Sequence, residues 1–205
     1  IVDTAKYHFL AWQKIADSLG IAFTPEHNEA LKGVSRVRSL DLILELGHAT
    51  ATQADKDRWL HEKNQDYLAY IENMDHTEIL PGVVHVLKHL RENSQPIALG
   101  SASKNARPIL EKTGILSYFD VIIDGNDVTN AKPDPEVFLQ AAKQCNIEPA
   151  DAIVFEDSVA GIEAANAGGM TSVGIGSDEV LHKAQYIFPD FVHIDLSFID
   201  MLMKK

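Results

Sequence analysis

Two adjacent carboxylates, Glu156 and Asp157, follow directly after the apolar run at residues 153–155. This run predicts a buried strand, and the helical spacing that begins with Val159 on its apolar face predicts a helix capped by Ser158. Two carboxylates about 4 Å apart repel by roughly 4 kcal/mol at an effective dielectric near 20, so the pair favours a proton or a cation. Mg²⁺ suits such oxygen ligands. The alternative is a solvated turn whose acids stabilise the helix N-terminus.

A second apolar run, at residues 96–100, is followed by five residues rich in hydroxyl, amide and amino groups: Ser101, Ala102, Ser103, Lys104 and Asn105. The helical pattern resumes at Ile109 and Leu110. Hydroxyls, backbone N–H groups and a lysine at a helix start can bind an anion such as phosphate. The alternative is that Ser101 or Ser103 only caps the helix.

A third predicted strand, at residues 119–124, is followed by Lys132, with Pro133 and Pro135 after it. The prolines restrict the backbone around the lysine, which would hold its ammonium in one place as a counter-charge for phosphate. A surface lysine beside a turn is the alternative. Because ligands bind at the carboxyl ends of parallel strands, we expect these three segments to form one site.

The order strand-Ser, strand-Lys-Pro, strand-Glu-Asp resembles the haloacid dehalogenase superfamily of phosphoryl-transfer enzymes, over nearly the whole chain. Within it, the segments IVDTAKYHFLAW (residues 1–12), LKGVSR (31–36) and SASKN (101–105) resemble the β-phosphoglucomutase family. The resemblance implies an α/β fold with a Rossmann-like parallel sheet core and an inserted α-helical cap. It also implies a Mg²⁺-dependent isomerase of carbohydrate metabolism. Such an enzyme interconverts β-D-glucose 1-phosphate and glucose 6-phosphate through an aspartyl-phosphate enzyme and glucose 1,6-bisphosphate.

The resemblance also implies roles for individual residues. Asp157 and Glu156 would bind the metal. Lys132 and Ser101 would take part in phosphoryl transfer. Thr4 and His8 are also implied as catalytic-site residues, at positions close to the hinge and the reacting sugar. Substrate contacts are implied for the cap loop, the core loop and one tryptophan: Lys32, Gly33, Val34, Ser35, Arg36, Ser101, Ala102, Ser103, Lys104, Asn105 and Trp12.

The planar fork of Arg36 suits a phosphate, and the resemblance implies that it grips the phosphate that is not being transferred. An ordinary helix start capped by Ser35 is the alternative for this loop. For His8 the alternative is a histidine packed on Trp12 along one helix face.

The family's Asp-x-Asp-Gly motif, which supplies its nucleophile and its general acid/base, is not among the 205 residues. We expect it upstream of Ile1, and an intact mass above 22.6 kDa would support this expectation. Two alternatives remain open. One is a sugar-phosphate phosphatase of the same superfamily, and the other is a non-catalytic sugar-phosphate-binding protein that lacks the motif.

Periodicity separates a helical block at residues 5–79 from an α/β region at residues 80–205. The resemblance implies that the helical block is the cap, that residues 80–205 are the core, and that residues 1–4 are the end of the first core strand and the hinge. The cap shows four helical stripes, with Thr24 and Ser35 as caps for the second and third. In the core, helices alternate with predicted strands at 96–100, 119–124, 152–156 and 171–176. That alternation predicts a parallel sheet.

Composition limits the classes of partner. The 18 Lys and Arg against 30 Asp and Glu give a formal net charge of −12, which argues against nucleic acid. The sequence has no apolar run of about 18 residues, so no membrane span is expected. The single cysteine, Cys145, favours a reducing compartment. We expect a cytoplasmic monomer, and the resemblance implies that its ligands are small sugar phosphates.

Overall fold

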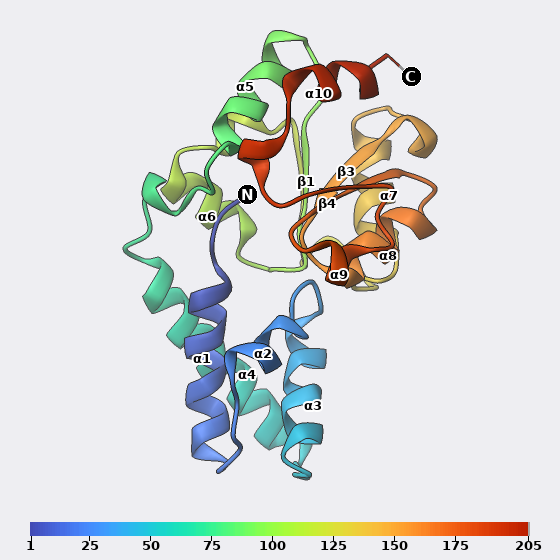
Figure 1. Ribbon diagram of the computed structural model, residues 1–205. Helices are drawn as coiled ribbons and strands as arrows, with labels where there is room; N and C mark the ends of the chain where they lie inside the picture. Colours follow the sequence, from blue (N-terminus) through green and yellow to red (C-terminus); the bar gives the residue numbers. More distant parts are fainter. Residues whose placement is uncertain (205) are drawn as a thin grey trace.

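A helical lobe and an α/β lobe make up the computed structural model, which describes residues 1–204 (Figure 1). The last residue of the predicted core region, Lys205, lies outside the described residues. The helical lobe contains α1 (Ala5–Ser18), α2 (Pro25–Glu29), α3 (Arg36–Leu46) and α4 (Gln53–Ile71). In this part of the fold the sequence pattern is strongly helical, and the four helices enclose their own apolar cluster around Trp12, Leu40 and Ile43.

Two helices of this lobe begin at a residue whose side-chain hydroxyl caps the first turn. Thr24 accepts a hydrogen bond from the backbone N–H of His27, with Pro25 in the first turn of α2. Ser35 accepts one from the N–H of Arg38 at 3.2 Å and begins α3. Both predicted caps are confirmed.

Short strands alternate with helices in the second lobe, as predicted. The strands are β1 (Ala98–Gly100), β2 (Val121–Ile123), β3 (Ile153–Glu156), β4 (Thr171–Ile175) and β5 (Tyr186–Phe188). The helices are α5 (Val83–Glu92), α6 (Ala106–Thr113), α7 (Glu136–Gln144), α8 (Val159–Ala167), α9 (Asp178–Leu181) and α10 (Leu196–Leu202), with 3₁₀ turns at His76–Glu78, Leu116–Tyr118, Pro149–Asp151 and Phe191–His193. Strand β5 was not predicted. It has only three residues, all partly buried, and so short a segment shows no clear alternation of apolar and polar residues.

The strands pair in parallel, which confirms the predicted fold class. They form two sheets rather than one: β1 pairs with β2, and β3, β4 and β5 form the other. Among residues 1–204 no strand joins β1 to β3, and Val2 makes a single antiparallel bridge with Ile79. The carboxyl ends of β1 and β3 carry the two loops in which the sequence predicted a site.

Helix α8 corrects one predicted contact. Val159, expected on the apolar face, is 43% exposed, whereas Ile162, Ala164 and Ala165 are buried. Val159 is the first residue of the helix and lies before the turn that packs on the sheet. Separately, no helix within residues 1–204 combines the length and the apolar character needed to cross a bilayer.

Candidate active site

The carboxylate pair lies where β3 ends. Glu156 is the last residue of the strand rather than part of the turn, and Asp157 follows it. Ser158 caps α8 as predicted, accepting from the N–H of Gly161 at 3.0 Å. Ser158 also donates its hydroxyl to Glu156 Oε1 at 2.7 Å. A Cβ on Gly161 would lie 2.1 Å from Glu156 Cδ, so only glycine leaves room for the Glu156 side chain here.

Lys132 is buried, and the alternative of a surface lysine is wrong. Its Nζ donates to Glu156 Oε2 at 2.8 Å and to the carbonyl of Gly100 at 3.2 Å. The two side chains of the ion pair are 5% and 9% exposed. The lysine therefore joins the end of β1 to the end of β3, and its charge lies among the residues predicted to bind a phosphoryl group.

The two neighbouring carboxylates differ in their affinity for a proton. Burial opposes ionisation of Glu156, but Lys132 and Ser158 outweigh it and hold the pKa of Glu156 below its usual value. Burial and the adjacent charge of Glu156 raise the pKa of Asp157. Asp157 is thus the carboxylate whose charge is least compensated by the protein, which is where an added cation would be stabilised most.

The donor set fits a hard divalent ion, because both groups supply carboxylate oxygens. Within residues 1–204, no three His, Cys, Asp or Glu side chains gather closely enough to hold a metal by themselves. An ion held by Asp157 and Glu156 would therefore also need ligands from substrate or water, as is usual for Mg²⁺.

Ser101 and Ser103 shape the core loop without capping a helix. Ser101 Oγ accepts from the N–H of Ser103, and Ser103 Oγ accepts from the N–H of Asn105, each at 3.1 Å. The N-cap of α6 is Asn105, so the alternative that either serine caps the helix is wrong. The loop follows directly after β1. The last residue of β1 is Gly100, whose carbonyl accepts a hydrogen bond from Lys132. Lys104 is exposed at the rim of this loop, between Ser103 and Asn105.

The cap loop rests on the core beside the carboxylates. Gly33 has a φ of +77°, and a Cβ there would lie 2.4 Å from Ser158 Oγ. Lys32 forms an exposed ion pair with Glu29 at 2.7 Å, and its charge also acts on Asp157. Val34 packs against the apolar cluster of the helical lobe. The predicted cap loop and core carboxylates are thus brought together.

A second basic cluster lies inside the helical lobe, and sequence reasoning missed its central residue, Lys63. Lys63 Nζ lies 2.8 Å from His8 Nδ1, 4.6 Å from the ring centroid of Tyr67 and 5.0 Å from that of Trp12. The His8 ring stacks on Tyr67 with centroids 4.2 Å apart. Thr4 is the N-cap of α1 and makes no side-chain capping bond.

One sequence signal could have identified Lys63. It falls four residues before Tyr67 and three after Leu60, on the apolar stripe of α4, where a lysine interrupts an otherwise buried face. Its side chain is buried, with 2% of the residue exposed. Within residues 1–204 Lys63 forms no ion pair with a carboxylate, which is unusual for a buried lysine and makes it a candidate functional residue.

Electrostatics make this cluster a potential anion site. Burial and the charge of Arg36 lower the pKa of Lys63 to about 7. Burial, followed by the charges of Lys63 and Arg36, lowers the pKa of His8 to about 3, so this imidazole is neutral at pH 7. Arg36 is itself half-buried, and burial lowers its pKa. A bound phosphate would compensate these bases.

A pH experiment tests the state of Lys63. Folded Lys63 releases its proton near pH 7 and an unfolded lysine near 10.5. Between these values the unfolded state binds the extra proton, so the contribution of Lys63 to the unfolding free energy rises with pH. We expect the wild type to gain about 2 kcal/mol relative to Lys63→Met between pH 7 and 9, measured by chemical denaturation. Lys143→Met, at an exposed site on α7, is the control. Parallel pH curves for the wild type and Lys63→Met would contradict the assignment.

Comparison with known proteins identifies relatives along nearly the whole chain. A model of the haloacid dehalogenase-like hydrolases matches residues 1–169. A beta-phosphoglucomutase of Bacillus subtilis is 40% identical over 189 residues, covering 91% of this chain and 84% of that protein. The crystal structure of a beta-phosphoglucomutase from Clostridium difficile matches 100% of this chain and 92% of its own, with a TM-score of 0.94 and 40% identity. A fructose-1-phosphate phosphatase of Escherichia coli is 31% identical, covering 85% of this chain and 90% of the relative.

Proposed function

Because the chain belongs to the haloacid dehalogenase-like hydrolase family, we propose that it is a β-phosphoglucomutase. It interconverts β-D-glucose 1-phosphate and glucose 6-phosphate through an aspartyl-phosphate enzyme and glucose 1,6-bisphosphate. The observation that carries this proposal is the 40% identity to a beta-phosphoglucomutase over 91% of the chain. The direct test incubates the full-length natural protein with Mg²⁺, β-glucose 1-phosphate and a trace of the bisphosphate, and measures glucose 6-phosphate formation.

In the core, Asp157 and Glu156 would hold Mg²⁺, which supplies positive charge to the oxygens of the transferring phosphoryl group. Lys132, from the segment after β2, and Ser101, at the end of β1, bind the same oxygens, together with the backbone N–H of Ala102. The burial of the Lys132–Glu156 pair supports this assignment, because a fixed and desolvated ammonium stabilises charge better than a mobile one.

The nucleophile and the general acid/base of the family are not among the 205 residues. Ile1 lies close enough to Asp157 and Glu156 to interact with them electrostatically. The proposal assigns binding, orientation and charge neutralisation to the residues described here.

In the cap, Arg36 holds the phosphate that is not reacting, with Lys32 and the backbone around Gly33, Val34 and Ser35 forming the loop. His8 and Lys63 lie behind this loop and orient the sugar end of the substrate, while Trp12 and Tyr67 enclose them. Thr4, at the start of α1, serves the hinge. Lys104, Ser103 and Asn105 bind the phosphate or hydroxyl nearest the core. The concentration of cations in an acidic chain supports an anionic ligand here.

A sugar-phosphate phosphatase is the second candidate, favoured by the 31% identity to a fructose-1-phosphate phosphatase. A phosphatase transfers the phosphoryl group to water and has less need of a second phosphate-binding residue. Arg36 therefore distinguishes the two activities.

Arg36→Ala is expected to weaken steps that use glucose 1-phosphate about ten- to a hundred-fold, because a charge-assisted contact is worth roughly 1.5 to 3 kcal/mol. Phosphorylation by acetyl phosphate, which has no second phosphate, should change little. Both rates are measured on the full-length chain by single-turnover kinetics.

Arg38→Ala is the matched control, since Arg38 lies on the same helix and pairs with exposed Glu45. Equal losses with both donors in Arg36→Ala would mean that Arg36 contacts no second phosphate. Release of free phosphate without glucose 6-phosphate would favour the phosphatase.

We further propose the division into residues 1–4, 5–79 and 80–205, and a cytoplasmic monomer acting on small sugar phosphates. The separate apolar clusters of the two lobes support the division. Size-exclusion chromatography with light scattering tests the monomer.

A further inference from the structure

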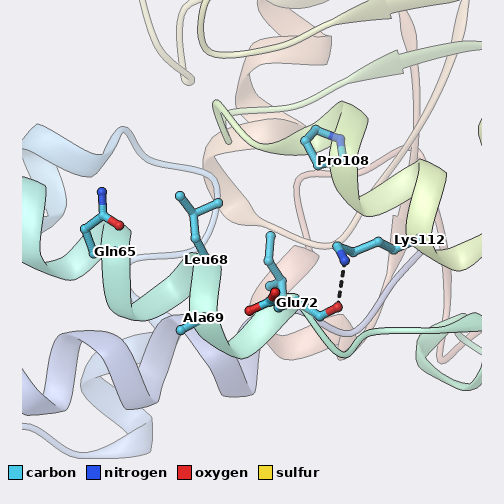
Figure 2. Close-up of a pocket in the computed structure, with 7 residues that line it drawn as sticks. Gln65, Leu68, Ala69, Glu72, Pro108 and Lys112 are labelled. Atoms are coloured by element: carbon cyan, nitrogen blue, oxygen red, sulfur yellow. Dashed lines mark hydrogen bonds between the residues drawn. The ribbon is translucent and has the colours of Figure 1, made fainter.

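Helix α4 of the helical lobe approaches α6 of the core, and two polar contacts, each of which involves a cap residue of one helix, join them. Asn105 Nδ2 donates to Asn64 Oδ1 at 3.1 Å, and Lys112 Nζ donates to the carbonyl of Glu72 at 2.6 Å. Figure 2 shows the Lys112 contact at the C-terminal end of α4. Because Glu72 lies eight positions after Asn64, the contacts lie about 12 Å apart along the axis of α4.

The Glu72 end of this seam is held by apolar packing. Tyr67, Ile71 and Met74 belong to one buried cluster with Ile109 of α6. Opening the seam at this end would expose the cluster to water, at a cost in proportion to the apolar area. The Lys112 bond lies at the same end, which therefore has the properties of a pivot.

The Asn64 end is held differently. Asn64 and Asn105 are each only partly buried, and their amides can exchange this bond for water at small net cost. A pocket of about 340 Å³ lies beside the Lys112 contact and is lined by Gln65, Leu68, Ala69, Ile71, Glu72, Pro108 and Lys112 (Figure 2). At the Asn64 end a hydrogen bond between two partly buried amides makes the contact, whereas the Glu72 end also has the apolar cluster.

The side chain of Asn105 does not cap helix α6 and contacts Asn64 instead. As the N-cap of α6 it is of the type that accepts from a first-turn N–H, yet it makes no capping bond and donates to Asn64 instead. Asn105 ends the core loop that starts at Ser101, and Asn64 follows Lys63 directly. One hydrogen bond thus connects the core loop to the helix that carries the Lys63–His8 pair.

We propose that the Asn64–Asn105 hydrogen bond is a closure latch for the cap, with Asn64 as a positioning residue. It forms when the cap loop is seated on Ser158, and it fixes the Asn105 amide toward the substrate while α4 pivots at the Lys112 contact. The identity of the substrate in this inference rests on the proposed function, whereas the hydrogen bond itself does not.

Kinetics test the coupling to substrate. Asn64→Ala should lower kcat/KM for β-glucose 1-phosphate about three- to tenfold, the range of one net hydrogen bond, and leave phosphorylation by acetyl phosphate unchanged. Gln65→Ala, the adjacent position on the pocket rim, is the control and should match the wild type with both donors. A purely structural role would reduce both rates together and lower the melting temperature. That result, or an unchanged kcat/KM, would overturn the proposal.

Crosslinking tests the latch independently of any activity. In a Cys145→Ser background, the pair Asn64→Cys and Asn105→Cys should form a disulfide on mild oxidation, detected by loss of two thiols, whereas Gln65→Cys with Asn105→Cys should not. The oxidised pair should lose glucose 1-phosphate turnover relative to the same protein after reduction, because the cap cannot open. Failure to crosslink, or equal turnover in the two forms, would refute the latch. If the reduced protein makes no glucose 6-phosphate, the thiol count still tests the latch and the proposed function alone fails.

Discussion

Asp157→Ala is expected to abolish phosphoryl transfer, by about 10³-fold or more, while the protein stays folded. Asp157 is the carboxylate whose pKa is raised by burial and by Glu156, so it is the group that a divalent cation would stabilise most. Loss of the cation removes several kcal/mol of charge stabilisation from the transition state. The measurement is single-turnover phosphorylation of the full-length chain by acetyl phosphate, over a range of Mg²⁺ concentrations.

Stability separates a lost ligand from a lost fold. Removing Asp157 relieves repulsion with Glu156, so the melting temperature in the absence of metal should stay the same or rise. Chelation of metal should stop the wild type as well. Asp151→Ala, at an exposed turn before β3, is the control and should retain full activity. Wild-type turnover by Asp157→Ala without added metal would refute the metal assignment.

Lys132→Ala should reduce the same single-turnover rate about 10²- to 10³-fold, comparable to the loss of one preorganised donor to a developing charge. The variant should also be less stable, because it leaves the buried Glu156 carboxylate without its partner. Breaking such a pair costs about 3 to 5 kcal/mol. The rate must therefore be measured well below the melting temperature of the variant.

A double variant separates these two effects of Lys132. Lys132→Met combined with Glu156→Gln removes both buried charges, so stability should recover relative to Lys132→Ala whereas the rate should not. Lys143→Ala, on the exposed face of α7, should change neither quantity. A single-turnover rate in Lys132→Ala equal to that of the wild type would leave Lys132 with a structural role only.

Sequence patterns predicted the features that depend on residues close together in the chain. Thr24, Ser35 and Ser158 each accept from an N–H three residues later, so their capping roles follow from local spacing. The strands before Ser101 and Asp157 are likewise visible as short apolar runs. The family followed from the order of these segments, and the comparisons confirm it.

Tertiary structure alone decided which distant side chains meet. Lys132 and Glu156 are 24 residues apart and His8 and Lys63 are 55 apart, and no local pattern states either pairing. The Asn64–Asn105 contact, across 41 residues, depends on how α4 packs against α6. Helical and strand periodicity identify the face that is buried, but the packing of whole elements selects its partner. The same packing sets the desolvation that lowers the pKa of Lys63, which is why its chemistry could not be derived from the chain alone.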